Sequence, residues 1–81
     1  SENMPTTAIP ADKLTDGAIN ILDLMVECGL VPTKSEARRN VQQGGVSVNN
    51  EKVTDPKAMI PLDGETILKK GKKVFHKVTL G

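Results

Sequence analysis

The chain has 81 residues and a net charge of +1. This length gives one small domain that buries only about 60–65% of its unfolded surface. With one Phe and neither Trp nor Tyr, its core must rely on Leu, Ile and Val. The single cysteine, Cys28, excludes an internal disulfide and a CxxC metal site. As a small buried hydrophobe it fits a reducing cytoplasm. No apolar run approaches the roughly 18 residues of a membrane span.

The charge is distributed unevenly along the chain. Residues 1–29 carry five acidic side chains and one basic side chain, a balance of −4. Residues 30–81 carry ten basic and five acidic side chains, a balance of +5. Such asymmetry favours a surface that faces a polyanion.

Residues 1–18 are predicted to form a linker. Pro5, Pro10 and Gly17 interrupt any helix, and the apolar residues of this stretch occur singly, without a period. The chain begins at Ser1 and its first methionine is Met4. We therefore expect a piece of a longer protein, with the folded domain beginning at residue 19.

A core helix is predicted next. Asn20 is a strong N-cap, and Asp23 lies at the third helical position, where it favours the positive end of the helix dipole. Apolar residues cover more than half of the circumference up to Cys28, and Gly29 ends the helix. Pro32 prevents any continuation, so a second helix must follow after a short connector.

The second helix is short and basic, and it leads directly into a β-hairpin. Thr33 and Glu36 form a capping box that fixes its start. Ala37 and Val41 make a narrow apolar stripe that can seat the helix on a core. Gly44 can adopt the left-handed conformation that ends the helix.

The remaining chain is predicted to be mainly strands. Residues 46–53 read as a hairpin with Asn49 and Asn50 at its turn, because Asn tolerates positive φ. Residues 58–60 form a short apolar piece, and residues 65–69 and 73–80 read as two strands joined by a tight turn. The sequence thus predicts an α+β domain in which two N-terminal helices pack on a small, mainly antiparallel β-sheet.

The sequence contains few residues that could form a catalytic site. The only histidine, His76, has no acid or nucleophile placed near it by the sequence, so a structural or solvent-facing role is expected. Gly71 lacks the upstream glycine and the following Ser or Thr of a phosphate-binding loop. We expect this chain to catalyse nothing by itself and to hold no cofactor or metal.

Residues that could bind an anion are more numerous, and they are concentrated in the second helix. Lys34 and Arg38 share one face at i, i+4 in its first two turns, where free amides and the dipole favour anions. Arg can grip a phosphate with two hydrogen bonds, whereas Lys acts as a point charge. The alternative interpretation is a solvated helix whose charge Glu36 balances. The candidate anion-binding residues are Lys34, Ser35, Arg38, Arg39 and Gln42.

A second basic cluster lies near the C-terminus, at Lys69, Lys70, Lys72, Lys73 and Lys77. It favours contact with a polyanion, although lysines on an edge strand also discourage aggregation. Modules for unstructured single strands stack bases on several aromatic rings. Because Phe75 is the only aromatic residue, the domain is expected to bind folded RNA by contacting the RNA backbone and recognising the RNA shape.

Residues 33–38 and 42–50 resemble the RNA-binding domain of ribosomal protein S-four, an alpha-L RNA-binding motif. The family pattern is [Ser/Thr]-[Arg/Lys]-x-x-Ala-Arg, a Gly that ends the helix, and then Val-x-Val-Asn-Gly. Here Lys34 replaces the more frequent Arg, and Asn50 replaces the usual turn Gly. The resemblance implies RNA contacts by Lys34, Ser35, Arg38 and Gln42 of the helix and by Asn49 of the hairpin.

Within this group the chain is most similar to the C-terminal domain of bacterial tyrosyl-tRNA synthetase. Residues 21–31 are similar to the first helix of that domain, and residues 67–78 to its terminal strand with the Gly-Lys-Lys motif. An acidic, Pro-containing linker also leads in, as in the synthetase. The resemblance then covers nearly the whole chain, and it makes Lys72 and Lys73 further, weaker candidates for RNA contact.

This resemblance implies that the chain binds the long variable arm and the anticodon region of tRNA(Tyr). ATP-dependent tyrosine activation would belong to a missing N-terminal domain, through which the parent enzyme would form a homodimer in the cytoplasm. The alternative is the RNA-binding module of an rRNA pseudouridine synthase or of a ribosome-associated RNA-binding protein. A protein–protein adaptor would need an exposed apolar patch, which the sequence does not clearly offer.

Overall fold

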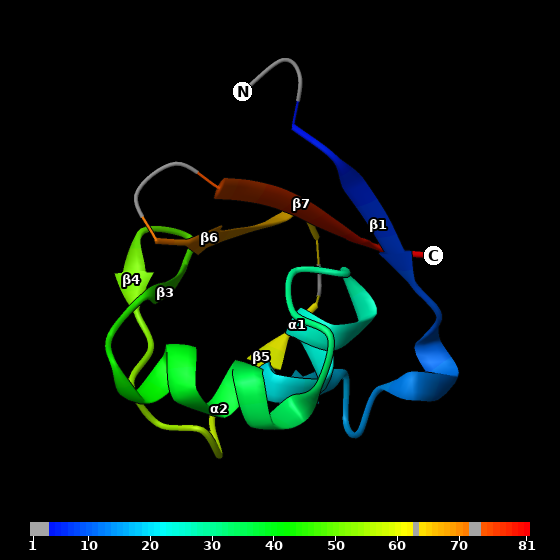
Figure 1. Ribbon diagram of the computed structural model, residues 1–81. Coiled ribbons are helices and arrows are strands. Elements are labelled where there is room, and N and C mark those ends of the chain that lie inside the picture. Colours follow the sequence, from blue (N-terminus) through cyan, green and yellow to red (C-terminus); the bar gives the residue numbers. More distant parts are fainter. Residues whose placement is uncertain (1–3, 63, 72–73) are drawn as a thin grey trace.

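The computed structural model describes residues 4–62, 64–71 and 74–81. A five-stranded sheet in the order β1-β7-β6-β3-β4 forms one layer, and α1 and α2 lie on one of its faces together with the small sheet β2-β5 (Figure 1). The elements are β1 Thr6–Ile9, η1 Ala11–Lys13, β2 Ala18–Asn20, α1 Ile21–Glu27, α2 Lys34–Gln42, β3 Val46–Val48, β4 Glu51–Lys52, β5 Met59–Pro61, β6 Thr66–Lys70 and β7 Val74–Leu80. The predicted α+β class is confirmed, since only the β1–β7 pair of the large sheet is parallel.

The N-terminal stretch corrects one expectation, because it is not simply a linker before residue 19. Strand β1 pairs in parallel with β7, Thr6 opposite Lys77, and Ile9 at its end is 1% exposed. A four-residue edge strand needs only one deeply buried side chain, so it shows no hydrophobic period. Its partner lies at the other end of the chain, where local signals cannot identify it.

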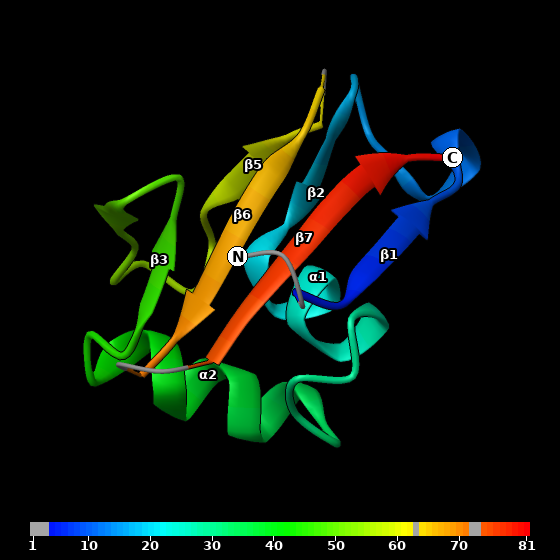
Figure 2. The same ribbon diagram turned by 90° about the horizontal axis from the view of Figure 1, so that it is seen from above.

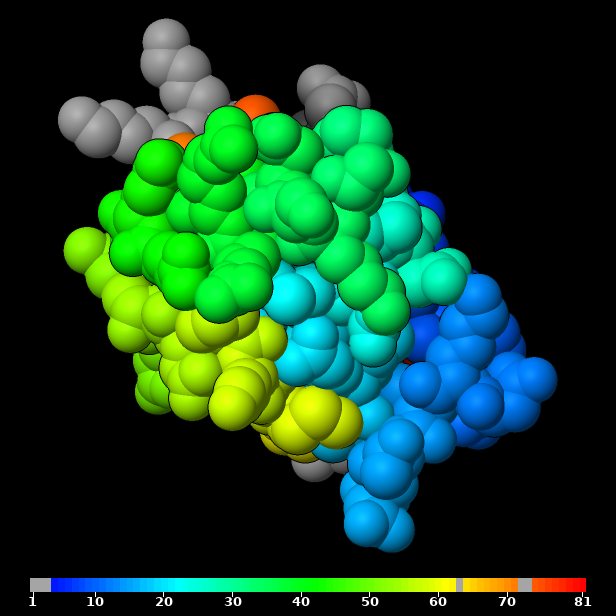
Figure 3. Space-filling model, turned by 60° about the horizontal axis from the view of Figure 1, so that its bottom comes forward, coloured from blue at the N-terminus to red at the C-terminus, as the bar shows by residue number. Residues whose placement is uncertain are grey.

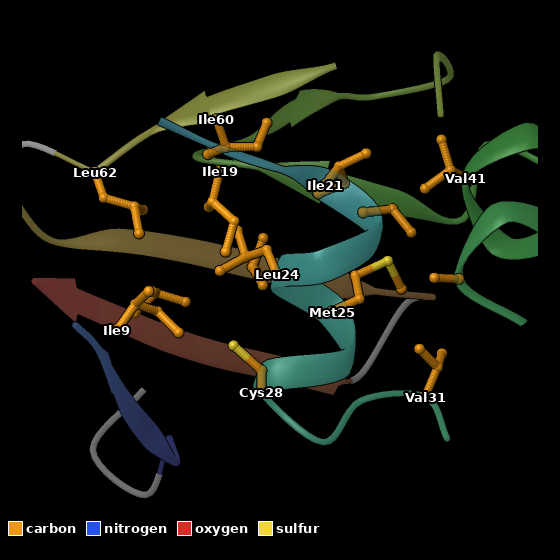
Figure 4. Close-up of a cluster of buried hydrophobic side chains, with 14 residues drawn as sticks. Ile9, Ile19, Ile21, Leu24, Met25, Cys28, Val31, Val41, Ile60 and Leu62 are labelled. Carbon is orange, nitrogen blue, oxygen red and sulfur yellow. The ribbon is translucent and has the colours of Figure 1, made fainter. Parts of the chain in front are cut away.

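The core lies between the large sheet and the helices, and α1 runs through it (Figure 4). Ile21, Leu24 and Met25 of α1 are completely buried, which confirms the prediction of a main core helix. Asn20 caps this helix, since its side-chain oxygen accepts a 3.1 Å hydrogen bond from the N–H of Leu22.

The short apolar piece near residue 59 forms β5, which pairs antiparallel with β2 immediately before α1. Ile19 and Ile60 are opposite each other in this pair, and both are buried. The small sheet therefore anchors the start of α1 to the long connection between β4 and β6.

The side chains of β7 alternate between the two faces of the sheet, but the ends of the strand differ from its centre. His76 and Val78 face the core, whereas Val74 and Leu80 on the same side are 47% and 48% exposed. Both exposed residues are at the ends of the strand, which crosses the sheet beside β6 (Figure 2). In the described part of the chain, neither helix is long and apolar enough to cross a membrane.

Candidate nucleic-acid interface

Helix α2 presents most of the predicted site residues. Thr33 fixes its start, since the threonine hydroxyl accepts a 3.3 Å hydrogen bond from the N–H of Glu36. Ala37 and Val41 are completely buried, as the narrow apolar stripe predicted. The rotation of the helix is thereby set, and its opposite side is open to solvent (Figure 3).

Five predicted residues lie together on this open side, which we call the α2 surface. They are Lys34, Ser35, Arg38, Arg39 and Gln42, and all are exposed. The spacing of three and four residues places them on adjacent turns of one helix. The structure thus gathers every α2 residue of the predicted site on one surface, which runs from the N-terminal end of the helix at Lys34 to its last residue, Gln42.

Two cations of the α2 surface already have acidic neighbours. Lys34 Nζ lies 2.7 Å from Oδ1 of Asp23 in α1, and Arg39 Nη1 lies 3.7 Å from Oε1 of Glu36. Both pairs are largely exposed, and such pairs contribute little in water. A phosphate could therefore replace either carboxylate at low cost.

Arg38 is the least neutralised cation of the α2 surface. Among residues 4–62, 64–71 and 74–81, no carboxylate forms an ion pair with its guanidinium. It lies one turn from Lys34 and one turn from Gln42, so a phosphate held by Arg38 has further donors on both sides. Arg38 is consequently the residue of the α2 surface at which a bound anion would gain the most favourable interaction energy.

The hairpin turn has the backbone that the sequence predicted. Asn49 and Asn50 both adopt positive φ, 50° and 70°. The side-chain oxygen of Asn49 also accepts a 2.9 Å hydrogen bond from the N–H of Ile67, and its own N–H donates 2.8 Å to the Ile67 carbonyl. Asn49 therefore ties the hairpin to β6, and its side-chain amide nitrogen remains for the RNA contact that the family resemblance implies.

Lys72 and Lys73 lie outside the described residues, so the structure does not place these two candidates. The described end of their turn is Gly71, whose N–H donates a 2.6 Å hydrogen bond to the Gly45 carbonyl, just beyond the end of α2. Gly71 also has a φ of 68°, which glycine adopts without strain. Gly71 is thus attached next to the C-terminal end of the α2 surface.

The lysines of β6 have roles that the sequence analysis missed. Lys70 Nζ donates a 2.9 Å hydrogen bond to the carbonyl of Leu30 in the α1–α2 connector. Lys69 Nζ lies 5.5 Å from the centroid of the Phe75 ring. The alternation of side chains along β6 could have indicated the inward position of Lys70, because Lys70 lies on the same side of the strand as the buried Leu68.

The buried titratable groups are structural. His76 is 6% exposed, its Nε2 lies 2.6 Å from Thr7 Oγ1, and burial lowers the pKa of its imidazole. Burial also raises the pKa of the Cys28 thiol to about 11, which outweighs the opposing effect of a hydrogen bond with Thr7. The neutral thiol is a poor nucleophile. Within the described ranges, no group of His, Cys, Asp and Glu side chains is arranged to hold a metal ion.

The fold and the α2 surface define the chain as a small α+β domain whose exposed basic helix leads into a β-hairpin. A family model described as the tyrosine–tRNA ligase SYY-like C-terminal domain matches residues 2–78. The chain belongs to this family.

Curated relatives agree with this assignment. A tyrosine–tRNA ligase of Acetivibrio thermocellus is 44% identical over 84 residues, which cover 99% of this chain and 20% of the relative. One of Treponema denticola is 48% identical over 80 residues, covering 93% of this chain and 20% of the relative. The chain thus spans about a fifth of the length of these relatives.

A solved structure shows the same fold. The solution structure of a tyrosyl-tRNA synthetase C-terminal domain is 26% identical, with a TM-score of 0.77. The match covers 99% of this chain and 81% of that one. The fold that the sequence resemblance implied is therefore confirmed over nearly the whole chain.

Proposed function

We propose that the chain is the tRNA-binding C-terminal domain of a tyrosine–tRNA ligase. It grips the long variable arm and the anticodon region of tRNA(Tyr), so that a catalytic domain elsewhere in the parent enzyme can aminoacylate the tRNA. The parent uses ATP in that catalytic domain, forms a homodimer through it, and acts in the cytoplasm. Family membership supports the parent, and the α2 surface supports the contact with RNA.

The exposed guanidinium of Arg38, with which no carboxylate of the described residues pairs, is the observation that carries the proposal. It stands on an exposed helix face between Lys34 and Gln42, without a carboxylate partner among the described residues. RNA phosphates are regularly spaced anions, and each contact with a cation releases condensed counterions. A rigid helix that presents Arg38 with flanking donors suits the backbone of a folded RNA better than a flexible single strand.

The first experiment titrates the chain with tRNA(Tyr), and with the same tRNA lacking its long variable arm, over a salt series. Tighter binding to the intact tRNA, weakening steeply with salt, is expected. Equal and weak binding to both would instead favour the RNA-binding module of an rRNA pseudouridine synthase or of a ribosome-associated protein. Absence of binding to either at low salt would overturn the RNA-binding function.

A variant then tests the α2 surface itself. Arg38→Ala should lower affinity and flatten the salt slope by roughly 0.7–0.9, while alanine preserves the helix. The matched control is Lys13→Gln, which also removes one positive charge but lies in η1, away from α2 (Figure 3). An equal loss of slope in both variants would count against Arg38 as a phosphate ligand.

A further inference from the structure

One face of the large sheet has no covering element in the described part of the chain. Both helices lie against the face that carries Leu68, His76 and Val78, and no helix or strand of the described residues covers the opposite face (Figure 2). Strand alternation and the register assign the side chains of this outer sheet face. They are Thr6, Ala8, Ser47, Ile67, Lys69, Phe75, Lys77 and Thr79.

The only Phe, Tyr or Trp side chain of the protein, Phe75, lies on this face near the start of β7. Phe75 is 41% exposed and sits on β7, directly opposite Lys69 of β6. The Lys69 ammonium lies 5.5 Å from the ring centroid. Phe75 does not belong to the buried core cluster, and a large part of its side chain stays in contact with water. Packing of the core therefore does not explain its place.

Cations flank the ring within the same surface. Lys77 follows Phe75 by two residues on one strand, and Lys69 faces it across the neighbouring strand about 4.8 Å away. Lys77 forms an exposed ion pair with Glu65, 3.1 Å between Nζ and Oε2. Since exposed pairs are weak, both lysines can turn to an incoming anion.

This combination selects a nucleic acid over a second copy of the chain. A symmetric dimer through the outer sheet face would bury Lys69 and Lys77 against the same lysines of its partner, which is costly. An unpaired nucleotide offers an aromatic face for the ring and phosphates for both ammonium groups. Base–aromatic stacking is also stronger than the exposed cation–π contact that it would displace.

We propose that the outer sheet face is a second RNA-contact surface, on which Phe75 stacks against one unpaired nucleobase while Lys69 and Lys77 contact the adjoining phosphates. This inference rests on the proposed tRNA-binding function and extends it from backbone contacts to a base contact. The N–H of Gly71, just after β6, donates a hydrogen bond to the Gly45 carbonyl, so this end of β6 lies next to the end of α2.

Substitutions at Phe75 test the proposal with tRNA(Tyr) as the probe. Phe75→Leu should bind about tenfold more weakly with an unchanged salt slope, because it removes a stack but no charge. Lys69→Gln should flatten the slope. Leu80→Ala is the matched control: it truncates a similarly exposed residue on the opposite side of β7 and should bind like the parent chain. Circular dichroism confirms that each variant is folded.

Phe75→Trp adds a direct readout, because the chain has no other Trp and no Tyr. This variant should keep its affinity, and its indole emission should be quenched by a stacked base. If the parent chain binds tRNA(Tyr) but Phe75→Leu binds equally well, or the indole is not quenched, only this inference fails. If the parent chain does not bind tRNA(Tyr), the proposed function fails as well. A dimer that Phe75→Leu dissociates in sedimentation would assign the face to a second copy and also overturn the inference.

Discussion

Thr7 Oγ1 lies 2.6 Å from Nε2 of His76, which joins the first strand of the protein to the last on the buried side of the sheet. Either tautomer of the neutral imidazole satisfies this hydrogen bond, because the threonine hydroxyl both donates and accepts. The contact supplements the parallel backbone pairing of β1 with β7. It is one reason that the N-terminal stretch belongs to the folded domain.

Loss of this contact should loosen β1. Thr7→Val keeps the shape of the side chain but leaves the imidazole nitrogen without its partner, and we expect a loss of about 1–2 kcal/mol in the free energy of unfolding. Urea denaturation measures it. The control is Thr6→Val, next to it on the exposed side of the strand, which should change stability by less than about 0.5 kcal/mol. Equal effects would mean that the hydrogen bond contributes nothing.

Stability should fall with acidity because of His76. Burial lowers the pKa of the folded imidazole below its ordinary value of 6.5. Between the folded and unfolded pKa values the unfolded chain therefore binds more protons, and the free energy of unfolding rises with pH. Acidification from pH 8 through 6.5 and below should destabilise the protein until the folded imidazole is also protonated. The carboxyl groups titrate at lower pH and add their own effects.

His76→Gln isolates the histidine contribution, since glutamine can still bond to Thr7 but does not titrate. The difference in melting temperature between pH 8 and pH 5.5 should shrink in this variant. A pH dependence identical to that of the parent chain would show that His76 is not responsible.

Lys70 should behave as a structural lysine. Lys70→Met keeps the aliphatic stem but removes the hydrogen bond to the Leu30 carbonyl, so we expect a loss of about 1–2 kcal/mol in the free energy of unfolding. Lys57→Met is the comparison, because Lys57 is an exposed loop residue whose replacement should be nearly neutral. Chemical denaturation of both variants decides whether Lys70 fastens the α1–α2 connector.

The thiol of Cys28 should be unreactive in the folded protein. Burial raises its pKa to about 11, so the nucleophilic thiolate is scarce at pH 8. Iodoacetamide should modify it far more slowly in buffer than in strong urea, as mass spectrometry can follow. Comparable rates in the two conditions would mean that the site opens readily.

The two asparagines of the hairpin turn should respond differently to glycine. Asn50→Gly relieves a positive φ of 70° without removing a hydrogen bond that the structure shows, and should be neutral or stabilising by up to about 1 kcal/mol. Asn49→Gly also relieves a positive φ but removes the bond to the Ile67 N–H, and should destabilise. Thermal melts that ranked the two variants in the opposite order would refute this division of roles.

The sequence by itself determined the elements whose signals are local. The caps at Asn20 and Thr33, the end of α2 near Gly44 and the turn at Asn49 depend on residues within a few positions, where backbone preference and side-chain hydrogen bonds act directly. The α2 surface followed from the same kind of reasoning. Once the apolar stripe sets the rotation of a helix, its exposed side chains are known.

Tertiary structure alone decided the features that join distant parts of the chain. Three such contacts link residues separated by 40 or more positions. They are the pairing of β1 with β7, the Thr7–His76 hydrogen bond and the hydrogen bond from Lys70 to the Leu30 carbonyl. Short strands leave almost no periodic trace, and a lysine looks the same in sequence whether it contacts solvent, a carbonyl or an aromatic ring. Such pairings form only because burial of the common core brings their partners together.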